Sequence, residues 1–205
     1  MRRYKTPPIS EHNLQLFDSS TSMAETVAGF LLDGFRHGEP LLVVATPEHR
    51  ELISQRLEEA GVNVHQAAMA SRLLMLDAAQ TLNKFMRHDL PSRIAFDEIV
   101  GTLVAQLAGQ GRLRIYGEMV DVLAARGQYK AAYQLEVLWS ELGKREPFTL
   151  FCGYSSAHFS DPKTAAILGR ICETHGRVHH KKSDVMAELV LERQDSGGPR
   201  GSSGS

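Results

Sequence analysis

The chain has few cysteines, no excess charge of either sign and no long apolar run. Its 205 residues include only Cys152 and Cys172, which are too far apart for a paired-thiol motif and too few for a disulfide framework. The formal net charge of -1 provides no general attraction to nucleic acid. The longest apolar runs, such as 41–45, are far shorter than the roughly 20 residues that span a bilayer. These absences favour a protein of the reducing cytoplasm that binds neither membranes nor nucleic acid directly.

The two ends differ in composition from the rest of the chain. The basic start MRRYKTPP is followed by polar SEHNLQLFDSS, so the apolar segment of a signal peptide is missing. The end, QDSGGPRGSSGS, consists largely of Gly, Ser and Pro, which bury too little apolar surface to become ordered. We therefore expect a flexible arm over 1–10, a single domain over 11–192 and a disordered tail over 193–205.

Between the two ends, apolar runs alternate with segments of helical periodicity. Strands are predicted at 13–17, 40–46, 72–78, 112–117, 148–154 and 186–193, and helices at 23–34, 46–61, 79–89, 96–111, 118–127, 128–143 and 161–176. This alternation predicts an α/β fold of three layers, with a mostly parallel sheet between helices. Ligands of such sheets bind where strands end, which here directs attention to the loops ATPEH, YGEM and CGYSS.

The motifs of the common nucleotide-binding and hydrolytic enzymes are missing. The chain contains no GxxxxGK[ST] phosphate loop and no GxGxxG dinucleotide fingerprint. It also lacks the GxSxG turn that exposes a catalytic serine. We therefore predict a protein that is not an enzyme, with no catalytic residue and no cofactor. A residual nucleotide-binding protein is kept as an alternative.

Two carboxylates stand at positions that need an explanation. Glu118 follows a strand and starts a helix, where the helix dipole favours a negative charge, so helix capping alone could explain it. Glu136 borders the apolar stripe of the next helix, and a carboxylate there needs a partner because burying it unpaired is costly. The candidate partners are His49, Arg114, Tyr154 or a ligand.

One group of residues could hold a metal ion. Cys172 and His175 would share a helical face, and His179 follows shortly after. Structural zinc sites usually bring paired ligands from two segments, whereas free cysteines are often simply buried. The favoured interpretation is a core cysteine beside exposed histidines, so no metal site is predicted. The basic stretch HHKKSD that begins at His179 is interpreted as a solvated turn.

Several separated blocks of the sequence resemble the MEDS domain, the methanogen/methylotroph sensory domain of prokaryotic signalling proteins. The resemblance covers about residues 10–180, and GEMV, LE before LW, and CGY are its most specific parts. The blocks are HNLQLFD, FLLDGFRHGEPLLVVATPEHRELISQRLEEAGVNV, RLLMLDAAQTLNKFM, LRIYGEMVDVLAARGQYKAAYQLEVLW and FTLFCGYSSAHF.

The resemblance implies a cytoplasmic sensory domain that recognises simple hydrocarbon derivatives and is often joined to histidine kinases or DNA-binding regulators. It also implies a RecA-like fold with a degraded nucleotide loop, here ATPEHREL, in agreement with the missing phosphate-loop motif. The residues on recurrent family positions are His12, Gly38, Glu39, His49, Asp77, Gly117, Glu118, Glu136, Trp139, Cys152 and Tyr154.

The resulting hypothesis is a non-enzymatic sensory or regulatory domain that binds a small molecule and signals through a partner, such as a histidine kinase or a transcription regulator. An adaptor of a two-component or sigma-factor pathway without a ligand is the alternative, and a homodimer is a further option. The predicted ligand-binding residues are Thr46, His49, Glu118, Glu136, Trp139 and Tyr154.

Overall fold

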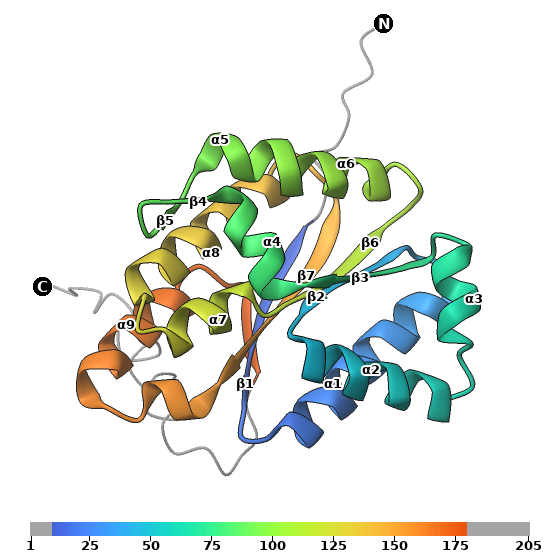
Figure 1. The fold of residues 1–205 in the computed structure, drawn as a ribbon, viewed down its shortest axis with the longest axis horizontal. Helices are drawn as coiled ribbons and strands as arrows, with labels where there is room; N and C mark the ends of the chain where they lie inside the picture. Colours follow the sequence, from blue (N-terminus) through green and yellow to red (C-terminus); the bar gives the residue numbers. More distant parts are fainter. Residues whose placement is uncertain (1–9, 180–205) are drawn as a thin grey trace, which may run out of the picture.

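A computed structural model describes residues 10–179 of the chain, with side chains described as far as residue 176. Six parallel strands form a central sheet in the order β3-β2-β6-β7-β1-β8, and helices cover both of its faces (Figure 1). The predicted α/β fold of three layers with a parallel sheet is therefore confirmed, and the arrangement is consistent with a RecA-like fold. The strands are β1 (Glu11–Phe17), β2 (Leu41–Ala45), β3 (Leu73–Asp77), β6 (Leu113–Gly117), β7 (Phe148–Ser155) and β8 (Arg177–His179).

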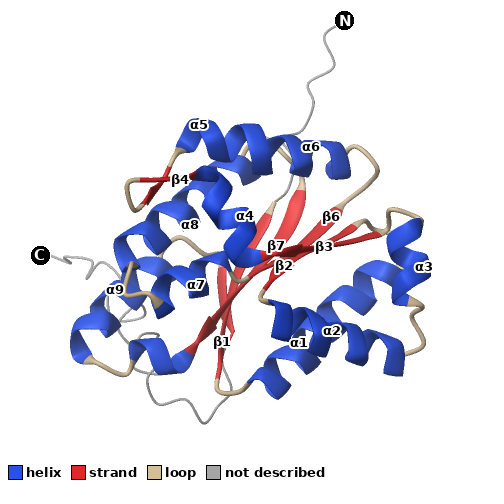
Figure 2. Cartoon of the chain, in the orientation of Figure 1, coloured by secondary structure: helices blue, strands red, loops and turns tan. Residues whose placement is uncertain are grey.

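The helices alternate with the strands along the chain (Figure 2). The strand predicted at 186–193, the tail and all but the last residue of the expected N-terminal arm lie outside the described residues. In the part of the chain that the structure describes, no helix combines the length and the apolar character needed to cross a membrane. The helices are α1 (Ser20–Arg36), α2 (Pro47–Glu59), α3 (Val64–Met69), α4 (Ala78–Phe85), α5 (Arg93–Phe96), α6 (Thr102–Ala108), α7 (Met119–Ala125), α8 (Tyr129–Gly143) and α9 (Pro162–Cys172).

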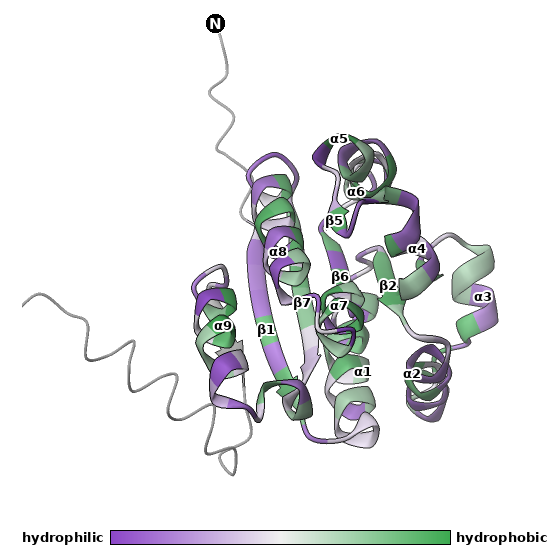
Figure 3. Cartoon of the chain, turned by 60° about the vertical axis from the view of Figure 1, so that its left-hand side comes forward, coloured by the Kyte–Doolittle hydropathy of each residue, from purple (hydrophilic) through white to green (hydrophobic). Residues whose placement is uncertain are grey.

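Each face of the sheet has its own apolar core. Side chains alternate between the two faces of a strand, so in β2 Leu42 and Val44 pack under α4 to α9, while Leu41 and Val43 pack under α1 to α3. All five residues of β2 are buried, and Figure 3 shows this strand as hydrophobic, in contrast to the largely hydrophilic α2. A strand covered on both faces therefore appears in the sequence as a continuous apolar run.

The prediction differs from the structure mainly between 60 and 110. The short helix α3 was not predicted. The helix expected over 79–89 ends at Phe85, and a small antiparallel hairpin follows, formed by β4 (Met86–Arg87) and β5 (Leu90–Pro91). His88 and Asp89 adopt positive φ at its turn, a conformation that no helix continues through. The helix expected over 96–111 starts earlier, at Arg93, and contains a π-helical segment, Asp97–Gly101, between α5 and α6.

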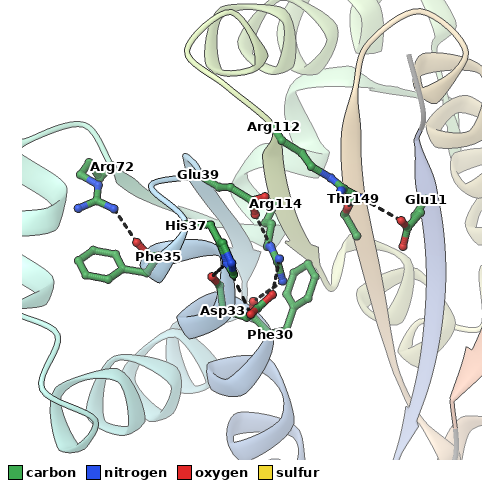
Figure 4. Close-up of polar contacts among 10 residues, drawn as sticks. All are labelled: Glu11, Phe30, Asp33, Phe35, His37, Glu39, Arg72, Arg112, Arg114 and Thr149. Carbon is green, nitrogen blue, oxygen red and sulfur yellow. Dashed lines mark hydrogen bonds and ion pairs between the residues drawn. The ribbon is translucent and has the colours of Figure 1, made fainter. Parts of the chain in front are cut away.

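A polar network at the amino end of β6 fixes α1 against the sheet (Figure 4). The guanidinium of Arg114 donates to Glu39, to Asp33 and, over 3.0 Å, to the carbonyl of Phe30. Gly34 leaves room for this side chain, because a Cβ there would lie 2.6 Å from Arg114 Cδ. Arg114 is thus committed to α1 and pairs with neither of the two carboxylates for which it was a candidate.

Candidate functional site

A cavity of about 250 Å³ lies where three neighbouring strands end. Its walls come from the carboxyl ends of β1, β6 and β7 and from the first turns of α1, α2 and α7. This is the edge at which ligands of parallel α/β sheets bind. The lining residues are Phe17, Asp18, Ser19, Ser20, Met23, His49, Tyr116, Glu118, Asp121, Gly153, Tyr154 and Ser155.

Glu118 is the centre of a buried hydrogen-bond network in this wall. Its Oε2 accepts from the backbone N–H of Thr46 at 3.0 Å, and its Oε1 accepts from His49 Nδ1 at 2.7 Å and from the hydroxyl of Tyr116 at 2.8 Å. The residue is only 2% exposed. Glu118 is the N-cap residue of α7, but its side chain makes no capping hydrogen bond to that helix, so capping alone does not explain it. Glu118 instead binds the start of α2, across the ends of two neighbouring strands.

Local sequence at the start of α2 explains how His49 reaches this carboxylate. Thr46 is the N-cap, its hydroxyl accepts from the backbone N–H of His49 at 3.4 Å, and Pro47 occupies the first helical turn. The imidazole of His49 then spans from Glu118 to the hydroxyl of Ser20, which lies 3.0 Å from Nε2. The hydrogen bond to Glu118 raises the pKa of His49 above its usual value, although burial opposes this shift. His49 therefore tends towards the imidazolium form.

Asp121 adds a second, half-buried carboxylate to the wall. Its Oδ1 accepts from the backbone N–H of Ser155 at 2.8 Å and lies 3.3 Å from His158 Nε2. Burial raises the pKa of Asp121, although the hydrogen bond from Ser155 acts in the opposite direction. With Glu118 and the exposed Asp18, three carboxylates line the cavity, and the lining residues include neither lysine nor arginine. The wall therefore suits a neutral or cationic group better than an anion.

Gly153 is required by the position of Tyr116. A Cβ on Gly153 would lie 2.5 Å from the Tyr116 hydroxyl and 3.0 Å from a ring carbon of Phe17. Burial raises the pKa of Tyr116 well above its usual value, so its hydroxyl stays a neutral donor to Glu118. The glycine of the CGY block thus lets the tyrosine of the neighbouring strand reach the carboxylate.

The structure divides the predicted ligand-binding residues into two groups. His49, Glu118 and Tyr154 line the cavity. Thr46 does not line it but donates its backbone N–H to Glu118. The other two, Glu136 and Trp139, are residues of α8, which contributes no residue to the cavity. Trp139 is 1% exposed and packs edge-on against Phe96 and Phe148, and Glu136 is fully buried. Neither of these two residues lines the cavity.

Glu136 is paired within a second cluster, between α8, α9 and the sheet. Its Oε1 accepts from the Tyr154 hydroxyl at 2.8 Å, and its Oε2 lies 3.1 Å from His12 Nε2, 3.4 Å from Cys152 Sγ and 3.4 Å from His175 Nε2. Tyr154 was a candidate partner, and it is the residue that connects the cavity to this cluster. Of the residues considered for a metal site, His175 was expected to be exposed, but its side chain is buried and joins the cluster. Cys172 does not join it, and the side chains of His179 and His180 lie outside the described part.

The charges of the second cluster depend on one another. Burial disfavours the ionised form of Glu136, but the charge of His175 and hydrogen bonds from both histidines outweigh burial and lower the pKa of Glu136. Burial also disfavours the charged form of His175, yet Glu136 raises the pKa of His175. Burial lowers the pKa of His12 and raises that of the Cys152 thiol well above its usual value. These shifts favour a carboxylate, an imidazolium, a neutral imidazole and a thiol in the cluster.

Sequence analysis missed several residues of the cavity. Asp18 and Ser20 follow the strand predicted at 13–17, so the same rule of strand ends could have identified them. Asp121 lies one helical turn after Glu118 and could have been found in the same way. The grouping of His12 with His175 had no such signal, because these residues come from opposite ends of the domain.

Comparison with known proteins assigns the family. A comparison with curated proteins found no match for the chain. The sequence model of the family described as MEDS, the MEthanogen/methylotroph, DcmR Sensory domain, matches residues 11–175. The matched segment runs from the first residue of β1 to His175 in the loop after α9 and contains both carboxylate networks. The chain therefore belongs to the MEDS family of sensory domains.

Proposed function

We propose that this sensory domain binds a small molecule in the cavity beside Glu118 and reports its presence to a partner signalling protein, such as a histidine kinase or a transcription regulator. The observation that carries the proposal is the pair of half-buried His49 and buried Glu118 in the wall of a cavity at the carboxyl edge of the sheet. Pockets for small molecules combine apolar walls with a few well-placed polar groups, and this cavity has both.

The size and charge of the cavity limit the class of ligand. Its volume of about 250 Å³ is below the range of roughly 300–1,000 Å³ that is usual for drug-sized ligands. The phosphates of a nucleotide would face three carboxylates without a lysine or arginine among the lining residues. A short alcohol or amine, with a small apolar body and a hydrogen-bond donor, fits better. The simple hydrocarbon derivatives that the family resemblance implies belong to this class.

The contacts of His49 suggest how a bound ligand would be sensed. The imidazole links the start of α2 to the end of β6 through Glu118 and to the start of α1 through Ser20. A ligand that takes over one of these hydrogen bonds favours one arrangement of α1 and α2 over another, and only such differential binding shifts a conformational equilibrium. The outer surface of this helix pair is then the region from which a partner reads the state of the cavity.

A thermal-shift screen tests the ligand. Short alcohols, short alkylamines, short carboxylates and magnesium-ATP are added to the full chain, and we expect an alcohol or amine to raise the melting temperature. At 100 times its dissociation constant a ligand stabilises by about 2.7 kcal/mol. Glu118→Gln, which keeps one acceptor oxygen, removes the negative charge and replaces the second oxygen with an NH2 group, should weaken binding at least tenfold. The matched control is Glu48→Gln, which removes an exposed carboxylate of the same α2 turn that does not line the cavity.

Three outcomes would contradict the proposal. A panel that leaves the melting temperature unchanged, together with capture of a signalling protein, would favour the adaptor without a ligand. Saturable binding of ATP would favour a residual nucleotide site. An alcohol or amine that binds Glu118→Gln as tightly as the unaltered chain would place the ligand outside the cavity.

A further inference from the structure

The second cluster contains side chains from four separate elements that meet at one point. His12 comes from β1, Glu136 from α8, Cys152 from β7 and His175 from the loop after α9. Each offers one atom that metals bind, and these four atoms lie within 4.8 Å of one another. We propose that His12, Glu136, Cys152 and His175 form a buried site for one divalent transition-metal ion of the zinc type.

The spacing of the four atoms is close to that of a tetrahedral site. Zinc lies about 2.0–2.1 Å from nitrogen, 2.0–2.2 Å from oxygen and 2.3 Å from sulfur, which separates neighbouring ligands by about 3.3–3.7 Å. Four of the six separations are known here. The His12 Nε2 to Cys152 Sγ distance is 3.3 Å, and Glu136 Oε2 lies 3.1, 3.4 and 3.4 Å from the atoms of His12, Cys152 and His175. An outward shift of a few tenths of an ångström admits the ion.

The surrounding residues orient both histidines as metal ligands. Nδ1 of His175 lies 2.8 Å from the carbonyl oxygen of Ile171, which can only accept, so Nδ1 carries the hydrogen. Nδ1 of His12 lies 3.2 Å from the hydroxyl of Ser140. Nε2 of each ring then points into the cluster. A ligating histidine usually makes such a hydrogen bond through its other nitrogen, and this bond fixes the tautomer and the ring.

The remaining oxygen of the carboxylate is also held in place. The hydroxyl of Tyr154 donates to Glu136 Oε1 and so leaves Oε2 directed at the other three ligand atoms. Each ligand therefore has an outer partner or a strand that fixes it, as Cys152 is fixed by β7. This second layer of contacts distinguishes a built site from a chance meeting of polar side chains.

One buried atom of the cluster is poorly satisfied by the protein. Nε2 of His175 makes no hydrogen bond of good geometry among the described residues, its contact with Glu136 Oε2 is 3.4 Å long, and its side chain is fully buried. Buried polar nitrogens without a partner are rare, and each needs an explanation. On metal binding this nitrogen would release its proton and donate its lone pair to the ion in the centre of the cluster.

The charge balance points to a divalent ion. A thiolate, a carboxylate and two neutral imidazoles carry a charge of -2, which an ion of +2 cancels, so the occupied site is neutral in a buried, largely apolar region. Two nitrogens, one sulfur and one oxygen suit zinc or cobalt, whereas magnesium and calcium require mainly oxygen ligands. Four protein ligands leave no open position, so the ion stabilises the fold or transmits a signal and is not catalytic.

Spectroscopy with cobalt tests the site. The full chain is stripped with a chelator and titrated with Co²⁺. We expect one Co²⁺ per chain, with the visible bands of a tetrahedral ion and an ultraviolet thiolate-to-cobalt band, and Zn²⁺ should then displace the cobalt. Cys152→Ser should lose the thiolate band. Cys172→Ser changes the other buried cysteine and should keep it.

A positioning variant gives a second, independent measurement. Ser140→Ala removes the partner of His12 without removing a ligand, and we expect the thiolate band to persist while Co²⁺ affinity falls about 10- to 100-fold. If Cys152→Ser does not fold, the Co²⁺ affinity of Ser140→Ala is compared with that of the unaltered chain instead. The proposal is overturned if the unaltered chain binds neither Co²⁺ nor Zn²⁺ in a one-to-one ratio, or if the band depends on Cys172 and not on Cys152. The cavity beside Glu118 is a separate site, so neither result decides whether it binds a ligand.

Discussion

His49 is the residue whose charge state most directly couples the cavity to the surrounding fold. Its imidazole holds three segments together: the start of α1, the start of α2 and the end of β6. Because the hydrogen bond to Glu118 outweighs burial, the pKa of His49 is higher in the folded chain than in the unfolded one. Protonation of this side chain therefore favours folding.

The sign of this shift predicts how stability depends on pH. The contribution of His49 is fully present below its unfolded pKa of about 6.5 and is lost as the pH rises through the higher folded pKa. We expect the difference in unfolding free energy between the unaltered chain and His49→Gln to be largest at acidic pH and to shrink above neutrality. Urea titrations of both proteins across this range measure it. A difference independent of pH would show that the pair does not contribute through its charge.

At the scale of elements, the packing of α1 on the sheet depends on a glycine. Gly34 lies against the side chain of Arg114, which holds α1 to β6 through Asp33, Glu39 and the Phe30 carbonyl. Replacing a helical glycine with alanine normally stabilises by up to about 1 kcal/mol. At position 34 the new Cβ displaces the side chain of Arg114, which is only 16% exposed. The guanidinium then loses its contacts with Asp33 and Glu39.

Two glycines of the same helix should therefore respond in opposite directions. We expect Gly34→Ala to destabilise by about 1–3 kcal/mol, the usual cost of overpacking. Gly29→Ala, where an added Cβ meets nothing within 4 Å, should stabilise by up to about 1 kcal/mol. Denaturant midpoints of the two variants provide the comparison. Equal effects would mean that Arg114 moves without losing its contacts.

At the scale of the whole molecule, two apolar cores share one sheet. Ile53 of α2 belongs to one core and Leu82 of α4 to the other, and both are fully buried. Because β2 and β6 contribute side chains to both cores, losing either core removes the support of the same strands. The two halves should therefore unfold together, as small domains usually do.

The single tryptophan allows this to be tested. Ile53→Ala and Leu82→Ala should each cost about 2–5 kcal/mol. Trp139 is a residue of α8 and packs in one core, whereas Ile53 packs in the other. If the cores unfold together, Ile53→Ala should shift the unfolding transition measured by Trp139 fluorescence as much as the one measured by far-ultraviolet dichroism. If the Ile53→Ala fluorescence transition stays at its original midpoint while the dichroism curve splits, the two cores unfold independently.

The fold was predictable to a large extent because its signals are local. Continuous apolar runs marked the buried strands, as in β2, and Thr46 with Pro47 marked the start of α2. The segment between 60 and 110 was less predictable. The positive φ of His88 and Asp89 belongs to residue types that also occur within helices, so the end of α4 at Phe85 left no clear signal. The short helix α3 is too brief for periodicity to reveal it.

The sequence by itself determined the alternation of the main strands and helices, and with it that Thr46, His49 and Glu118 lie at the carboxyl edge of the sheet, because parallel strands bring their carboxyl ends together. The contacts among these three residues came from the tertiary structure. Only the tertiary structure decided the partners of Glu136. Helical periodicity placed that carboxylate at the border of a buried face, whereas packing of α8 and α9 against β1 and β7 enclosed it completely, beside His12, Cys152 and His175. Periodicity describes one helix at a time, and a contact among four elements distant in sequence arises only when they pack together.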